Sequence, residues 1–184
     1  LLTSKNNNLL PDILLMTATP IPRTLELTTY GSMSVSKITE KPVGRQSIKT
    51  AAKPITKLEE TIISLKKTIK QNKKIYWVCP LIEESEKIDL AAAQQRFEAL
   101  QKCYPNNVLL IHGKMKSDER DEIMNKFKYG KTKILVSTTV IEVGIDIPEA
   151  TVMVIEHAER FGLSQLHQLR GRVGRGSSQS SCLL

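Results

Sequence analysis

Short, almost wholly apolar runs recur along the second half of the chain, and segments with helical spacing separate them. Such runs are typical of strands buried on both faces, because a strand with one wet face alternates apolar and polar residues. The sequence therefore predicts an α/β fold, in which helices cover both faces of a parallel sheet. The runs that carry this prediction are 75–79, 108–111, 134–137 and 152–155.

The intervals between these runs predict amphipathic helices. Thr56 and Glu59 have the spacing of a capping box, which would satisfy backbone N–H groups where a helix starts. Apolar residues then recur on one face of that helix. Nearer the N-terminus, Ile13–Met16 predicts a further buried strand. The other predicted helices cover 24–30, 86–103, 117–129 and 164–169.

Parallel sheets bind their ligands beyond the carboxyl ends of the strands. We therefore expect functional residues directly after each strand, and we assign a cluster of arginines near the C-terminus to the same edge. The candidates at this edge are 17–19, 79–84, 112–113, 138–146 and the arginine cluster at 168–175.

The positive charge of the chain is concentrated in one segment. Residues 37–74 hold eleven of the 27 Lys and Arg residues but only three of the 19 Asp and Glu residues. A local excess of this kind indicates a surface that faces a polyanion. The alternative is the solvated face of one lysine-rich helix, formed by Lys66, Lys67, Lys70, Lys73 and Lys74.

The cysteines and histidines do not predict a metal site. The three cysteines are scattered without a C-x-x-C pair, and the three histidines show no ligand spacing with them. An odd number of scattered cysteines favours a reducing, cytoplasmic environment. No apolar run approaches the length of a membrane span. Because the sequence does not begin with Met, we interpret it as a piece of a longer polypeptide.

Three arginines, spaced by glycines, stand close together in the string Gln168–Arg175. A guanidinium group matches phosphate oxygens in a bidentate way, so Arg172 and Arg175 are candidates for binding an anion. Glycines allow backbone angles and close approaches that other residues avoid. The alternative interpretation is a solvated basic turn.

Two other stretches resemble phosphate-binding loops to different degrees. Gly130-Lys131-Thr132 is not predicted to be one, because position 125 is Asn and the stretch lies between a helix and a strand. Thr138 and Thr139 directly follow a strand, where a phosphate could dock at a helix N-terminus. Gly144 and Asp146 could form a turn that presents a carboxylate to a ribose hydroxyl. A plain strand-turn-helix is the alternative.

Taken together, these strings resemble the motifs of superfamily-two helicases. Residues 17–24 resemble motif III, residues 140–148 motif V, and residues 168–175 motif VI with its Q-x-x-G-R-x-G-R pattern. The longer string 161–175 is similar in two families, the RecG branched-DNA helicases and the Mfd transcription-repair coupling translocases. The string 76–86 favours the RecG family.

The resemblance implies a motor with two RecA-like lobes and ATP with Mg²⁺ in the cleft between them. The chain would then comprise the end of the first lobe (1–41), a linker (42–47) and a P-loop NTPase-like second lobe (48–184). Branched DNA, the first lobe and an N-terminal wedge domain would be its partners, and the resemblance favours a monomer.

The same resemblance implies roles for single residues. Arg172 and Arg175 would be arginine fingers that reach the γ-phosphate, and we expect both to be exposed and mobile in this chain. The remaining residues would contact nucleotide (Gly144, Asp146, Gln168), couple hydrolysis to lobe movement (Thr17, Thr19), or touch the DNA backbone (His112, Gly113, Thr138, Thr139).

Two alternatives to the branched-DNA helicase remain open at this stage. One is the lobe of an Mfd-type translocase, which adjacent sequence would distinguish. The other is a passive nucleic-acid-binding module that uses the basic segment 37–74. Such a module predicts salt-sensitive DNA binding that survives loss of Arg172 and Arg175.

The 184 residues contain neither a Walker A loop nor an acidic Walker B motif. We therefore expect the purified chain to show no ATP hydrolysis and no DNA unwinding, because the groups that hold the phosphates and Mg²⁺ are missing. Phosphate release with and without DNA measures this. Robust turnover by the purified chain would contradict the expectation.

Overall fold

The computed structural model describes residues 14, 16, 34, 36–38, 40, 45–80, 86–138 and 147–184, without the side chains of 86–89. The chain divides into two compact units, Leu1–Thr39 and Glu40–Leu184.

The predicted helix at 24–30 lies outside the described residues. Leu14 and Met16 are 80% and 86% exposed and belong to no strand. The buried strand predicted at 13–16 is therefore not found at these positions, because an apolar run forms a strand only beside a pairing partner.

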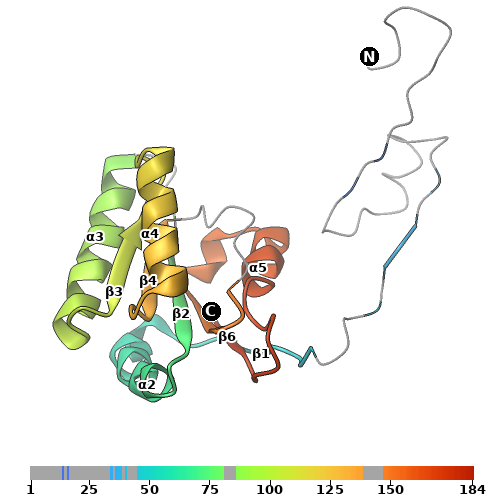
Figure 1. Cartoon of the computed structure of the whole chain (residues 1–184), viewed down its shortest axis with the longest axis horizontal. Coiled ribbons are helices and arrows are strands. Elements are labelled where there is room, and N and C mark those ends of the chain that lie inside the picture. The colour runs from blue at the N-terminus through green and yellow to red at the C-terminus, as the bar shows by residue number, and fades with distance from the viewer. Residues whose placement is uncertain are drawn as a thin grey trace, which may run out of the picture. The chain divides into compact units, whose positions relative to one another are not determined.

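Within the described residues of the second unit, six parallel strands form one sheet in the order β1-β6-β5-β2-β4-β3 (Figure 1). The predicted parallel sheet is thus confirmed, and the four apolar runs form β2 to β5. The strands are β1 (Lys49–Ala51), β2 (Lys74–Cys79), β3 (Val108–Ile111), β4 (Ile134–Thr138), β5 (Ala150–Ile155) and β6 (Ser181–Leu183).

Alternate residues of the central strands contribute to opposite faces of the sheet. On β2, Tyr76 and Val78 belong to one buried cluster, while Ile75, Trp77 and Cys79 belong to the other. Residues of α4 and α5 complete the first cluster, and residues of α2 and α3 complete the second. Helices therefore cover both faces, as predicted. They are α2 (Leu58–Lys70), α3 (Glu86–Cys103), α4 (Ser117–Tyr129) and α5 (Leu163–Arg170).

The start of α2 differs from the prediction. A 3₁₀ turn, η1 (Ile55–Lys57), precedes the helix, and no side chain caps it. The predicted capping box of Thr56 and Glu59 is therefore wrong. The N–H of Lys57 instead donates to the carbonyl of Pro54 (2.9 Å), so the 3₁₀ turn supplies an acceptor that a capping side chain would otherwise provide.

The sequence does not predict β1 and β6, the two strands at one end of the sheet. Each has three residues, and neither is a continuous apolar run. They form because they pair with each other and with β5: the N–H of Lys49 donates to Ser180 (2.9 Å), and that of Leu184 to Ala51 (3.0 Å). Cys182 at the centre of β6 is fully buried.

Lys74 does not belong to a wet lysine face. It is the first residue of β2 and only 4% exposed, whereas Lys66, Lys67 and Lys70 on α2 are exposed. Its Nζ donates to the carbonyls of Phe127 and of Lys128 (2.7 Å to the latter), at the end of α4. Burial lowers the pKa of this ammonium group, and nearby Lys133 lowers it further. Lys74 thus caps a helix C-terminus, where a cation is favoured.

Among the residues that the structure describes, no helix has both the length and the apolar character needed to cross a membrane.

The ring of Phe127 is fully buried under the sheet and lies 5.4 Å from that of Tyr76, centroid to centroid. We expect Phe127→Ala to lower the free energy of unfolding by about 3–5 kcal/mol, since it leaves a cavity in the core. Tyr129→Ala, on the same helix but 76% exposed, should cost at most about 1 kcal/mol. Urea denaturation of both variants measures the difference, and equal costs would contradict this description of the core.

Candidate functional site

One group of predicted site residues lies at the carboxyl edge of the sheet. His112 and Gly113 directly follow β3, and Thr138 ends the neighbouring strand β4. His112 is partly buried and Gly113 is exposed, whereas Thr138 is only 4% exposed. The turn at 112–113 is therefore the more accessible part of this group.

The imidazole of His112 lies in an environment that disfavours its charged form. Burial lowers its pKa below the ordinary value, Lys114 lowers it further, and Glu119 acts in the opposite direction. Its Nδ1 is buried and has no hydrogen-bond partner within the described parts of the chain. A neutral ring can donate only one hydrogen bond, so in this form His112 could contact a phosphate as a single donor.

A partly buried charged cluster that the sequence does not reveal also lies at this edge. Glu156 follows β5 and accepts from Trp77 Nε1 on β2 (2.5 Å) and from Arg96 on α3 (Nε to Oε1, 2.5 Å; Nη2 to Oε2, 3.1 Å). Arg96 also lies over the Trp77 ring, 5.7 Å from its centroid. Burial raises the pKa of the adjacent Cys79 thiol to about 12, with a further contribution from Glu156. This cluster joins α3 to two strands, and no spacing in the sequence signals it.

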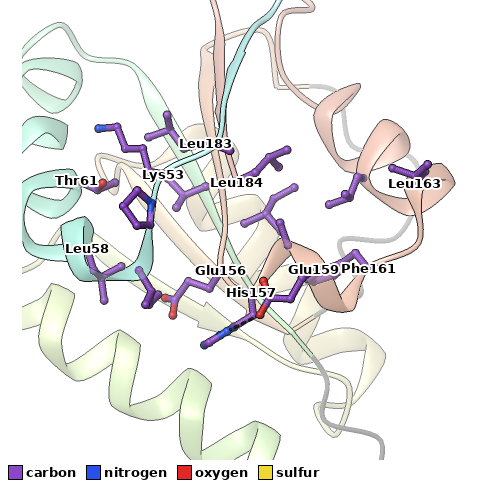
Figure 2. Close-up of a pocket in the computed structure, with 17 residues that line it drawn as sticks. Lys53, Leu58, Thr61, Glu156, His157, Glu159, Phe161, Leu163, Leu183 and Leu184 are labelled. Carbon is purple, nitrogen blue, oxygen red and sulfur yellow. Dashed lines mark hydrogen bonds and ion pairs between the residues drawn. The ribbon is translucent and has the colours of Figure 1, made fainter.

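A mainly apolar pocket of about 750 Å³ opens beside the carboxyl ends of β1, β5 and β6. Figure 2 shows Glu156, His157 and Glu159 on one side of it and Leu183 and Leu184 on another. His157 has a left-handed backbone (φ 51°), and its Nδ1 lies 3.0 Å from Glu159 Oε1. Of the predicted site residues that the structure describes, none lines this pocket.

The arginine cluster lies at the opposite edge of the sheet, which corrects the expectation that it follows a strand. It follows α5 and precedes β6, and the N–H of Gly174 donates to the carbonyl of Ala150, the first residue of β5 (3.4 Å). The sequence prediction failed because α5 returns the chain from the carboxyl edge to the amino edge before the arginines begin. We call residues 171–176 the arginine turn.

Two glycines of the arginine turn are required by its packing. Gly174 has φ +75°, and a Cβ there would lie 3.0 Å from the side chain of Ile48. A Cβ on Gly176 would lie 2.9 Å from the carbonyl oxygen of Pro148. Gly174 thus has the left-handed backbone that the glycine spacing led us to expect. Here the glycine is needed for packing against Ile48, and no ligand is required to explain it.

The two arginines differ in exposure. Arg175 is exposed, as expected, but Arg172 is partly buried. Gln168 is exposed on the last turn of α5. The remaining predicted site residues, namely Thr17, Thr19, Thr139, Gly144 and Asp146, lie outside the described residues.

The chemistry of the arginine turn fits an anion. The stretch 168–176 contains three arginines and no Asp or Glu. Guanidinium groups suit phosphate oxygens. Mg²⁺ needs oxygen ligands, and the only side chain of this stretch that offers one is Gln168. Among the described residues, no group of three His, Cys, Asp or Glu side chains could hold a metal ion.

Gly130-Lys131-Thr132 lies between α4 and β4, as the sequence indicated. The N–H of Gly130 donates to the carbonyl of Lys126 (2.9 Å) and closes the end of α4. A phosphate-binding loop precedes a helix instead, so this stretch is a helix terminus.

Comparison with known sequences gives a consistent result. Residues 54–177 match the family described as helicase conserved C-terminal domain. The chain is 53% identical over 176 residues to an ATP-dependent DNA helicase RecG of Synechocystis, 52% to that of Bacillus subtilis and 49% to that of Escherichia coli K12, in each case over 95% of its own length. It spans about a quarter of the length of these relatives, 21%, 26% and 25% respectively.

Comparison with solved structures supports the same fold. A structure of RecG bound to a three-way DNA junction matches 95% of this chain and 23% of its own, with a TM-score of 0.78 and 43% identity. Domain 2 of the DEAD-box helicase Mss116p, bound to an RNA duplex, matches 73% of this chain and 52% of its own, with a TM-score of 0.58 and 20% identity. The second likeness bears on the fold alone.

The left-handed backbone at Gly174 makes a specific stability prediction. Gly174→Ala should destabilise the chain by about 1–2 kcal/mol from the backbone alone, and the contact with Ile48 adds to this. Gly113→Ala should change stability by less than about 0.5 kcal/mol, because nothing lies within 4 Å of a Cβ there. Thermal and urea denaturation test the pair, and a neutral Gly174→Ala variant would show that the turn is not held as described.

Proposed function

Because the chain belongs to the family of helicase conserved C-terminal domains, we propose that it acts as the second motor lobe of an ATP-dependent branched-DNA helicase. The observation that carries the proposal is the arginine turn, which presents Arg175 to solvent on a backbone fixed by Gly174 and Gly176. The high identity to RecG proteins favours this helicase over other members of the family.

In this proposal, Arg172 and Arg175 bind the phosphates of ATP from one side of a cleft. Bound ATP with Mg²⁺ supplies the phosphoryl group whose transfer releases the free energy for movement. The two arginines stabilise negative charge that develops on that group, a contribution worth about 10³ to 10⁵ in rate. The arginine turn has no acidic side chain, and the Mg²⁺ ligands are proposed to lie in a first lobe of the same polypeptide. Gly144, Asp146 and Gln168 are proposed to contact nucleotide on this side.

DNA is proposed to lie at the other edge of the sheet. The turn of His112 and Gly113 offers an imidazole donor and accessible backbone, which suit contacts that position a phosphate chain without reading its sequence. Thr138 and Thr139 are proposed to contribute to the same edge, and Thr17 and Thr19 to couple hydrolysis to lobe movement.

Branched DNA is the proposed substrate, since a relative with 43% identity was solved on a three-way DNA junction. Remodelling of stalled forks and Holliday junctions would then place the protein in recombination and repair. A first lobe and a wedge domain would be its partners within one polypeptide, acting as a monomer.

A chimera tests the proposal directly. The chain replaces the aligned segment of the Bacillus subtilis relative, which is 52% identical over 176 residues. The chimera should hydrolyse ATP when branched DNA is present. Arg172→Ala and Arg175→Ala should each lower kcat by about 10³-fold or more, because charge in the transition state loses its partner. DNA affinity should stay within a few-fold, measured by fluorescence anisotropy.

Lys131→Ala is the matched control, since Lys131 is an exposed cation outside the arginine turn. It should leave kcat unchanged. A chimera without ATPase activity, or arginine variants that keep full ATPase activity, would contradict the motor proposal. In the latter case, DNA binding that persists and falls with salt would favour a passive module.

A further inference from the structure

The side chain of Arg45 holds the backbone of the arginine turn from a distant part of the chain. Its Nε donates to the carbonyl of Gly174 (3.2 Å) and its Nη2 to the carbonyl of Gly171 (3.4 Å). These two acceptors flank Arg172. Because the guanidinium group is planar and rigid, it fixes the separation of the two carbonyls, and hence the conformation of the backbone between them.

The residues that follow Arg45 continue this contact. We call residues 45–49 the clasp. The side chain of Ile48 packs against Gly174, the carbonyl of Ser47 accepts from Gln179 Nε2 (2.7 Å), and the N–H of Lys49 donates to Ser180 (2.9 Å). The clasp therefore runs beside the chain from the arginine turn to the start of β6.

We propose that Arg45 is a positioning residue for Arg172 and Arg175, an inference that rests on the proposed function of those two arginines. Arg45 acts through the carbonyls of Gly171 and Gly174 and does not itself contact the nucleotide. A catalytic cation must stay within a fraction of an ångström of its working position, and a displacement of about 1 Å can cost up to about 10²-fold in rate.

The position of Arg45 in sequence extends the inference. It lies in the segment 42–47, which the sequence predicts to be the linker between two lobes. A displacement of that segment would be transmitted to the arginine turn by two hydrogen bonds and one side-chain contact. The strands of the sheet would not have to move. The clasp thus couples the position of the linker directly to the backbone that carries Arg172 and Arg175.

Substitution of Arg45 in the chimera tests its effect on catalysis. We expect Arg45→Ala to lower kcat for ATP about tenfold while KM for ATP changes less than about twofold, as for a group that acts mainly in the transition state. Arg45→Lys should fall between the wild type and Arg45→Ala, because an ammonium group can reach one carbonyl but cannot bridge both. Lys102→Ala, which removes an exposed cation on α3, should leave kcat unchanged.

Amide hydrogen exchange in the 184-residue chain gives a readout that does not depend on activity. Arg45→Ala should speed exchange of the Gly174 amide, which donates to Ala150, about fivefold. The amides of β2 should keep their exchange rates, because β6 and β5 separate β2 from β1, the strand into which the clasp leads.

Three outcomes overturn the inference. They are an unchanged kcat in Arg45→Ala, unchanged exchange at Gly174, or faster exchange throughout β2, which would mean a merely structural role. Failure of the proposed function is separate: there, Arg172→Ala and Arg175→Ala would leave ATPase activity intact, while the exchange experiment on Arg45 would still report on the clasp.

Discussion

The insertion of β6 between β1 and β5 is the constraint on which the candidate site depends. Backbone hydrogen bonds tie β6 to both neighbours, and the fully buried Cys182 fixes its register. This pairing brings the clasp, which leads into β1, alongside the arginine turn, which precedes β6. Two segments more than a hundred residues apart thereby become one unit, although neither β1 nor β6 has enough apolar side chains to form a sheet by itself.

The central strands and helices could be predicted because each of them is determined by the pattern of residues within its own segment. Runs such as Ile75–Cys79 are apolar at every position, and only a strand covered on both faces buries all of them. The helices α3 and α4 likewise follow from their own spacing and begin and end where expected. The resemblance in motifs V and VI identified the helicase family for the same reason, since those strings are contiguous.

What could not be predicted depends on contacts between distant residues. Lys74 looked like one more solvated lysine, but its ammonium group caps α4 from another element. Glu156 has no sequence signal, yet it joins three elements through Trp77 and Arg96. The sequence assigns the arginines to the carboxyl edge, whereas they lie at the amino edge. A periodic pattern predicts that α5 is a helix, but it does not show at which edge of the sheet the helix ends.

The separation of the two edges sets the distance between the two candidate sites. A six-residue parallel strand such as β5 is about 17 Å long, at about 3.3 Å per residue. The arginine turn at the amino edge and the turn of His112 and Gly113 at the carboxyl edge are therefore separated by about the length of one strand. A small ligand held at one turn cannot contact a ligand held at the other, so any coupling between the two sites has to pass through the protein.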